Sequence, residues 1–255
     1  MKSVLLCLHG WGGSKESFAE LRDALRGADL EILAPDLPGF GSEQQPPRAW
    51  TTDDYADWVI CWLKGQLIGE SANRRVLLLG HSHGGRIAIK LAARLHDSSN
   101  VRPTVPITRL FLCASAGIRR PRHIKRIIGL LLAKIGKLIL SVPGLQLLRS
   151  PGKKLLYKLV RVHDYEKASP VMRETLIKVS AEDLTPLLPR VTVPTDIFWG
   201  EDDGMTPVAD GLLIHSLIRG SALHVFRGVR HRVHREKAVE IAAKIREALC
   251  DIHPS

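Results

Sequence analysis

The chain has 255 residues, of which 45% are hydrophobic and 25% are charged. This balance excludes an intrinsically disordered chain and supplies enough apolar side chains for one large core. The first apolar run, residues 4–8, is too short for a signal peptide, and no apolar stretch reaches the length of about 18 residues that a membrane span needs.

Short apolar runs alternate along the chain with longer amphipathic stretches. The apolar runs predict six strands, at residues 3–9, 30–35, 75–81, 107–114, 194–199 and 222–226. The stretches between them predict helices, at residues 14–26, 52–68, 84–96, 207–219 and 234–250. This alternation is typical of the α/β class, in which a mostly parallel sheet is covered by helices on both faces.

The alternation stops after residue 115. Residues 116–190 contain helical runs punctuated by prolines, but no convincing strand. We interpret this segment as a helical cap inserted after the fourth predicted strand. The remaining residues, 1–115 and 191–255, would then form the core domain.

The predicted cap carries the positive charge of the chain. Residues 117–167 contain 13 Lys and Arg but only 2 Asp and Glu, and their balance of +11 equals the formal charge of the whole chain. Residues 124–142 project onto a helix with a wide apolar face and basic side chains outside that face. Three interpretations stay open: a cap helix packed over the active site, a docking face for an acidic carrier protein or an anionic substrate, and attachment to an anionic membrane surface. Nucleic acid is not expected, because the segment has only Tyr157 and Tyr165 as aromatic residues and contains no binding motif.

The strongest motif is a Gly-x-Ser-x-Gly sequence centred on Ser82, which follows an apolar strand and opens a helix. A serine presented on a sharp strand-to-helix turn needs small neighbours, and Gly80 and Gly84 relieve the crowding there. The N-terminus of the following helix favours negative charge at the site. The motif therefore predicts that Ser82 is a nucleophile.

Other segments at the ends of predicted strands match a known pattern in order. They are His9-Gly10-Trp11-Gly12-Gly13, Asp36-Leu37-Pro38-Gly39-Phe40-Gly41-Ser42, Trp199-Gly200-Glu201-Asp202-Asp203-Gly204-Met205-Thr206-Pro207 and Gly228-Val229-Arg230-His231. With them the chain resembles the α/β-hydrolase family, in its small, capped serine carboxylesterase-like branch, over nearly the whole length outside the cap. Many relatives place two antiparallel strands before the His-Gly loop. Because His9 comes too early for them, we expect a reduced sheet of about six essentially parallel strands.

The resemblance assigns a catalytic triad. Ser82 matches the nucleophile, Asp203 matches the acid after the fifth strand, and His231 matches the base after the last strand. A serine hydroxyl is a poor nucleophile until an imidazole takes its proton, and the imidazole needs a carboxylate to fix its tautomer and stabilise its charged form. Asp202 and His234 are the rivals for acid and base. The family spacing favours Asp203, and His234 is expected to start a helix.

The resemblance also implies an oxyanion hole made of two backbone N–H groups, those of Trp11 and His83. The side chain of Trp11 is interpreted either as a wall of the acyl pocket or as a core aromatic. His81 and His83 flank the nucleophile, but their side chains are expected to point elsewhere. No metal site is expected, because His231-x-x-His234 lacks the His-Glu-x-x-His pattern and no third ligand is evident.

These features predict a cytoplasmic serine hydrolase that cleaves small-molecule carboxylic esters through an acyl-enzyme and requires no cofactor. The four cysteines show no pairing pattern and fit free thiols in a reducing compartment. Hydrolysis of a carbon–carbon bond or of a lactone is the alternative on the same triad. A ligand-binding or membrane-surface protein is the alternative outside enzymes. Residues 8–12 are also similar to the methyl-ester esterases of biotin synthesis, which act on an acyl group held by an acidic carrier protein.

Overall fold

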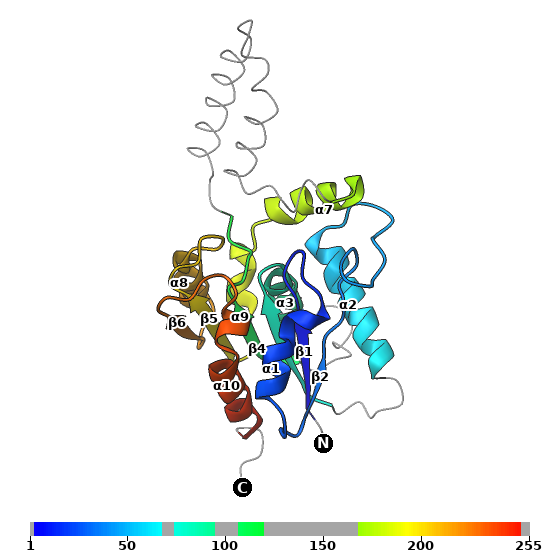
Figure 1. Ribbon diagram of the computed structural model, residues 1–255. Helices are drawn as coiled ribbons and strands as arrows, with labels where there is room; N and C mark the ends of the chain where they lie inside the picture. The colour runs from blue at the N-terminus through cyan, green and yellow to red at the C-terminus, as the bar shows by residue number, and fades with distance from the viewer. Residues whose placement is uncertain (1–2, 68–73, 95–106, 120–167, 251–255) are drawn as a thin grey trace, which may run out of the picture. The chain divides into compact units, whose positions relative to one another are not determined.

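The structure is a computed structural model that describes residues 3–67, 74–94, 107–119 and 168–250 (Figure 1). Its strands form one sheet, in the order β2-β1-β3-β4-β5-β6, and every neighbouring pair is parallel. The strands are β1 (Ser3–Leu8), β2 (Leu30–Leu33), β3 (Val76–His81), β4 (Ile107–Cys113), β5 (Thr195–Gly200) and β6 (Ala222–Phe226). The α/β class and the six parallel strands expected from the sequence are confirmed.

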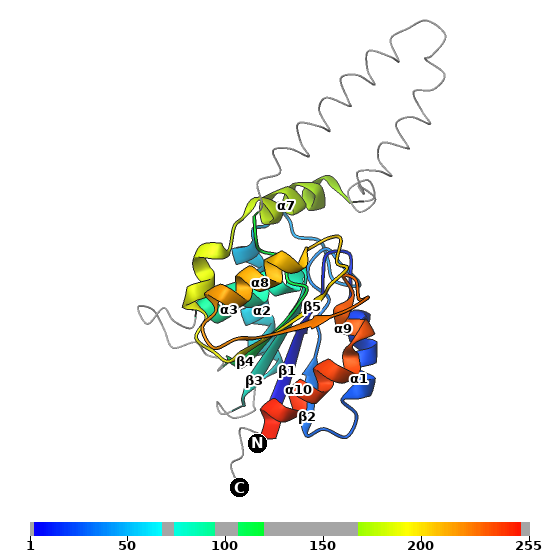
Figure 2. The same ribbon diagram turned by 90° about the vertical axis from the view of Figure 1, so that its left-hand side faces the viewer.

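Helices cover both faces of this sheet. They are α1 (Ala19–Ala24), α2 (Thr52–Gln66), α3 (His83–Arg94), α7 (Pro170–Ala181), α8 (Val208–Leu217), α9 (Val233–Glu236) and α10 (Ala238–Cys250), with 3-10 turns η1 (Lys15–Phe18) and η3 (Thr185–Arg190). Figure 2 shows the sheet between two helical layers, with α2, α3 and α8 on one face and α1, α9 and α10 on the other. Along the chain, α1 thus lies on one face, α2, α3 and α8 lie on the other, and α9 and α10 return to the face of α1.

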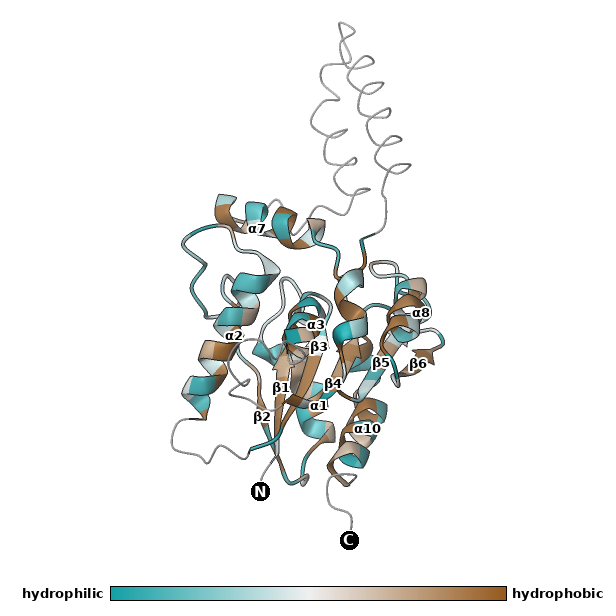
Figure 3. Cartoon of the chain, turned by 180° about the vertical axis from the view of Figure 1, so that it is seen from behind, coloured by the Kyte–Doolittle hydropathy of each residue, from teal (hydrophilic) through white to brown (hydrophobic). Residues whose placement is uncertain are grey.

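The core lies in the strands and in the helix surfaces that face them. Every residue of β1, β3 and β5 is buried, and Figure 3 shows the central strands in the hydrophobic colours while the helices carry both. A strand covered on both faces needs apolar side chains at successive positions rather than at alternate ones. This is why the strands were visible in the sequence as continuous apolar runs.

Local capping explains where two of the helices begin. The Ser14 side chain accepts a hydrogen bond from the backbone N–H of Glu16 at the start of η1, and the Thr51 side chain accepts one from Asp54 at the start of α2. The Asp54 side chain in turn accepts a hydrogen bond from the backbone N–H of Thr51 at 2.7 Å, which completes a capping box. These contacts satisfy N–H groups that the first helical turn leaves free.

The chain divides into two compact units, Met1–Arg119 with Glu174–Ser255, and Arg120–Arg173. In the second unit the structure describes only residues 168–173, which begin α7. The described parts of the predicted insertion, residues 116–119 and 168–190, contain α7 and η3 but no strand. The predicted domain boundaries stay a prediction, and the basic amphipathic helix at 124–142 lies outside the described residues.

None of the helices in the described ranges is both long enough and apolar enough to cross a membrane.

The strand order creates a switch point between β1 and β3. The chain leaves β1 for β2 on one side of the sheet, and all later strands are added on the other side. In open α/β sheets, ligands bind at such a point, outside the carboxyl ends of the strands. The register places Leu8 beside Gly80, so the loops that begin at His9 and at Ser82 start next to each other at this end of the sheet.

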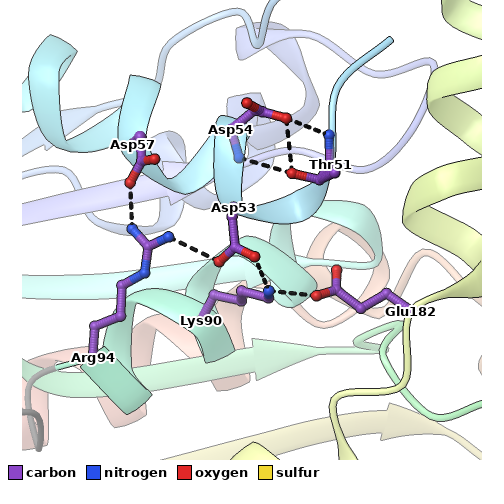
Figure 4. A network of polar contacts seen from close by, with 7 residues as sticks. All are labelled: Thr51, Asp53, Asp54, Asp57, Lys90, Arg94 and Glu182. Carbon is purple, nitrogen blue, oxygen red and sulfur yellow. Dashed lines mark hydrogen bonds and ion pairs between the residues drawn. The ribbon is translucent and has the colours of Figure 1, made fainter.

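A charged network ties α2 and α3 to the segment after α7 (Figure 4). The ammonium group of Lys90 lies 2.5 Å from Asp53 and also pairs with Glu182. Arg94 binds Asp53 at 2.8 Å and Asp57 at 2.6 Å. The lysine side chain is only 8% exposed, so the network holds a largely buried cation between two carboxylates from different parts of the chain.

Candidate active site

Ser82 lies on the sharp turn between β3 and α3. Its φ of +51° is in the left-handed region, which is strained for a residue with a side chain. A Cβ at Gly80 would lie 2.5 Å from the carbonyl oxygen of Gly84, and a Cβ at Gly84 would overlap the carbonyl of Leu8. Only glycines fit at these two positions, as the motif predicted.

The strained turn is held by backbone hydrogen bonds on both sides of the serine. The Ser82 N–H donates to the carbonyl of Cys113 at 3.1 Å, and the Ser82 carbonyl accepts from Gly85 and from Ala116 at 3.0 Å each. The helix that starts at His83 has no acidic residue in its first turn. Its free N–H groups and the positive end of its dipole therefore face the serine without a competing carboxylate.

His231 and Asp203, the base and acid predicted from the sequence, are hydrogen-bonded to each other. His231 Nδ1 lies 2.7 Å from Asp203 Oδ2, and the Asp203 side chain is fully buried. A carboxylate can only accept, so Nδ1 carries the hydrogen and Nε2 is left to exchange a proton with another group. The rival acid, Asp202, is exposed to solvent.

Asp203 is fixed by donors that come from its own loop. The backbone N–H groups of Met205 and Thr206 donate to Oδ1 at 2.7 and 3.0 Å, and the Thr206 hydroxyl donates to Oδ2 at 2.8 Å. Burial raises the pKa of the Asp203 carboxyl, but the hydrogen bond from His231 and these donors outweigh it and hold the pKa below its usual value. Sequence reasoning missed Thr206. An Asp followed three residues later by a hydroxyl is the signal that could have found it.

His234, the rival base, packs against His81, whereas Asp203 pairs with His231. His234 belongs to α9, as expected of a residue at a helix start, and it is buried. Its ring stacks on His81 with centroids 3.8 Å apart and meets the edge of Phe18 at 5.6 Å. Burial and the neighbouring His231 lower its pKa to about 3, so the ring is neutral.

The loop after β1 supplies the second side of the site. A Cβ at Gly10 would lie only 3.2 Å from the Cβ of Ser82, so the Gly10 backbone runs directly beside the serine. The Gly10 carbonyl accepts from the N–H of Gly13 at 3.0 Å and from His9 Nδ1 at 2.8 Å. In a planar trans peptide the N–H of Trp11 is antiparallel to this carbonyl, so fixing one fixes the other.

The tautomer of His9 follows from its two partners. Its Nε2 lies 2.9 Å from the Leu37 N–H, which can only donate, and its Nδ1 faces the Gly10 carbonyl, which can only accept. The imidazole is therefore neutral, with its hydrogen on Nδ1. Burial lowers its pKa against the opposing effect of the Gly10 hydrogen bond.

The side chain of His83 packs between two aromatic rings. It meets Trp11 with ring centroids 5.4 Å apart and Tyr55 at 4.9 Å, both edge to face. Tyr55 is in turn fixed by a hydrogen bond from its hydroxyl to the carbonyl of Pro38 at 3.0 Å. Burial lowers the pKa of His83 to about 3. Trp11 is partly buried, with its other edge against Phe40 at 4.8 Å, so it is an aromatic packed onto the core.

Across the described parts of the chain, no group of three or more His, Cys, Asp or Glu side chains is arranged to hold a metal ion.

Comparison with known proteins assigns this chain to a family. The model of the "Alpha/beta hydrolase family" matches residues 5–244. A pimeloyl-[acyl-carrier protein] methyl ester esterase of Neisseria meningitidis is 27% identical over 97% of this chain and 93% of its own length, and Lipase 3 of a Moraxella species is 25% identical over 89% and 71%. A solved esterase from Exiguobacterium antarcticum shares the fold, with a TM-score of 0.68 at 22% identity over 96% of this chain and 92% of that one. The chain belongs to the alpha/beta hydrolase family.

Proposed function

We propose that this protein is a serine hydrolase that cleaves carboxylic esters. The observation that carries the proposal is the hydrogen-bonded pair of His231 and the buried Asp203, 2.7 Å apart, at the same end of the sheet as the strained turn of Ser82. Relatives that are named as an esterase and a lipase support it.

The proposed reaction has two steps. The Ser82 oxygen attacks the ester carbonyl while His231 Nε2 takes the hydroxyl proton, and the tetrahedral intermediate collapses as His231 gives that proton to the leaving alcohol. Water then attacks the acyl-enzyme with His231 again as base, and the acid is released. The backbone N–H groups of Trp11 and His83 would stabilise the oxyanion in both steps.

The electrostatics of the site suit this reaction. The lowered pKa of Asp203 keeps its carboxyl ionised, so it can stabilise the imidazolium that forms on His231. The neighbouring ring of His234 is neutral, because its pKa is lowered to about 3. A neutral neighbour does not oppose the positive charge that His231 acquires in the transition state.

The proposal is tested at the nucleophile. Ser82→Ala should lower ester turnover by at least ~10³-fold while the urea unfolding midpoint stays close to that of the wild type. A fluorophosphonate probe should label the wild type at Ser82 and leave the variant unlabelled. Full activity in Ser82→Ala, with contaminating esterase excluded, would overturn the assignment. A panel of aryl esters, lactones and carbon–carbon bond substrates separates the proposed reaction from its alternatives on the same residues.

A second candidate concerns the substrate rather than the chemistry. The Neisseria relative is named for an acyl group on a carrier protein, and residues 117–167 of this chain carry the net positive charge. We infer that an acidic carrier docks on this segment, which lies almost entirely outside the described residues. The test replaces five basic residues with Gln: Arg119, Arg120, Arg122, Lys125 and Arg126.

Charge steering predicts a selective loss. The Gln variant should keep its kcat/KM on a small neutral ester and lose at least ~10-fold on a carrier-linked ester at low salt, with the loss shrinking as salt rises. Equal losses on both substrates would indicate disturbed cap packing. If the Gln variant loses no activity on either substrate but co-sediments less with anionic vesicles than the wild type does, the membrane-surface interpretation is favoured instead.

A further inference from the structure

His81 is buried at the centre of the proposed site, although the proposed reaction does not use its side chain. It is the last residue of β3, directly before Ser82, and only 7% of its surface is exposed. Its Nε2 lies 3.0 Å from the backbone carbonyl of His231. One imidazole thus joins the start of the nucleophile turn to the loop that carries the proposed base, across 150 positions of sequence.

The direction of this hydrogen bond is fixed by its partner. A carbonyl oxygen can only accept, so His81 Nε2 carries the hydrogen. Burial, with smaller effects from His234 and His231, holds the pKa of His81 well below its usual value. The ring is therefore neutral, and its Nδ1 has no hydrogen.

The rest of the ring is held by close packing. One face stacks on His234, with centroids 3.8 Å apart and planes inclined by 34°. On the Nδ1 side lies the Gly10 backbone, where an added Cβ would be 2.8 Å from Nδ1. His81 therefore contacts the loop after β1 and the loop before α9 at once, and these contacts leave the imidazole little freedom to turn.

The loop that carries His231 needs such a contact. It follows the edge strand β6, and Arg230 and Arg232 on either side of His231 are exposed. In the loop after β5, the N–H of Asp202 donates to the Val229 carbonyl at 3.0 Å. From β3, His81 holds the carbonyl of His231 itself.

These contacts point to a mechanical role. Asp203 fixes the His231 ring through Nδ1, while His81 fixes the main chain that carries the ring. A displacement of about 1 Å in a reacting group can cost roughly 100-fold in rate. Resting on the proposed function, we propose that His81 is a positioning residue that holds His231 in register with Ser82.

Three substitutions distinguish the effect of the His81 N–H donor from the effect of the size of the side chain. In His81→Gln the side-chain amide N–H comes to about the place of Nε2. The Asn side chain is one methylene shorter than Gln. In His81→Asn the amide N–H therefore lies at about the place of Nδ1 and does not reach the His231 carbonyl. His81→Leu keeps bulk and has no donor.

The expected result is a selective loss of kcat. His81→Asn and His81→Leu should lower kcat on a neutral aryl ester by ~10- to 100-fold, with KM within ~3-fold of the wild type. His81→Gln should recover most of this loss. On a His231→Ala background, the same Asn and Leu substitutions should change the residual rate by less than ~2-fold, because their effect passes through His231. Urea unfolding midpoints report the folded state of each protein.

Several results would overturn the role of His81. They are a kcat within ~2-fold of the wild type in His81→Asn and His81→Leu, a His81→Gln variant as slow as His81→Leu, and an equal loss of rate when the substitutions are made on the His231→Ala background. If only the Gln variant folds, His81 is needed for stability and the proposal also fails. An inactive wild type, or His231→Ala with full activity, would contradict the proposed function itself and is seen in the same assay.

Discussion

The carboxyl end of the sheet and the α2–α3 face are both dense in titratable side chains, but they differ in charge. Around the proposed nucleophile the pKa of four buried histidines is lowered, so their rings are neutral and held by hydrogen bonds, stacking and edge contacts: His9, His81, His83 and His234. On the α2–α3 face, Lys90 and Arg94 are paired with carboxylates in a chain of ion pairs (Figure 4).

The difference follows from what each region must do. A permanent charge beside the proposed base would change the energy of the imidazolium that forms there, whereas a neutral ring supplies shape and a single donor. The helical face has no reacting group near it, so ion pairs can join α2, α3 and the segment after α7. In the site, charge is therefore confined to Asp203 and to His231 when it is protonated during the reaction. On the α2–α3 face, ion pairs join the helices to each other.

The largest expected effect comes from breaking the Asp203–His231 pair. Asp203→Asn and His231→Ala should each lower kcat by ~10³- to 10⁴-fold, because the first misdirects the His231 tautomer and the second removes the base. Asp202→Asn is the matched control, because this neighbour is exposed, and it should stay within ~3-fold of the wild type. Steady-state kinetics on one aryl ester check all three. A loss in Asp202→Asn larger than that in Asp203→Asn would move the acid to the neighbouring residue.

The second prediction concerns how stability depends on pH. Histidines with a lowered pKa bind fewer protons in the folded chain than in the unfolded chain, where the pKa is ~6.5. Their stabilisation is therefore fully present above pH ~6.5 and is lost as the pH falls toward their folded pKa, which is about 3 for His83 and His234. From pH 7.5 to 5.5 each such histidine should cost roughly 1.4 kcal/mol in the free energy of unfolding.

Urea unfolding at pH 7.5, 6.5 and 5.5 measures this slope. The stabilisation from aspartates with a lowered pKa, such as Asp36, Asp53 and Asp203, is fully present above pH ~4 and changes only below it, so these carboxyls add nothing to the slope in this window. His83→Phe keeps an aromatic ring and should make the slope shallower by one proton. An unchanged slope would mean that His83 is protonated in the folded protein.

The smallest expected effect on catalysis concerns the charged face. Lys90→Met should lower the free energy of unfolding by about 1–3 kcal/mol, because it removes the cation that Glu182 binds and one of the two cations that Asp53 binds. The kcat on a neutral ester should stay within ~2-fold. Asp57→Asn is the matched control, because it removes only an exposed partner of Arg94 and should cost no more than ~0.5 kcal/mol. A loss of kcat in Lys90→Met comparable to that in Asp203→Asn would remove the distinction between the two regions.

Local chemistry made much of this protein readable from its sequence. The strands were visible because each lies in a sheet covered on both faces, and their ends were placed within about two residues. The turn at Ser82 was also readable, since Gly80 and Gly84 are required by clashes with neighbouring backbone. The predicted helices 14–26 and 234–250 are each divided in the structure, the first into η1 and α1 and the second into α9 and α10.

Only the tertiary structure decided which side chains meet. The sequence offered Asp202 beside Asp203 and His234 beside His231, and the fold pairs Asp203 with His231 while it stacks His234 on His81. The hydrogen bond from His81 to the His231 carbonyl crosses most of the sheet order, from β3 to the loop after β6. Helix and strand patterns depend on neighbours a few positions apart, whereas these contacts depend on how the parallel strands bring distant loops to one edge.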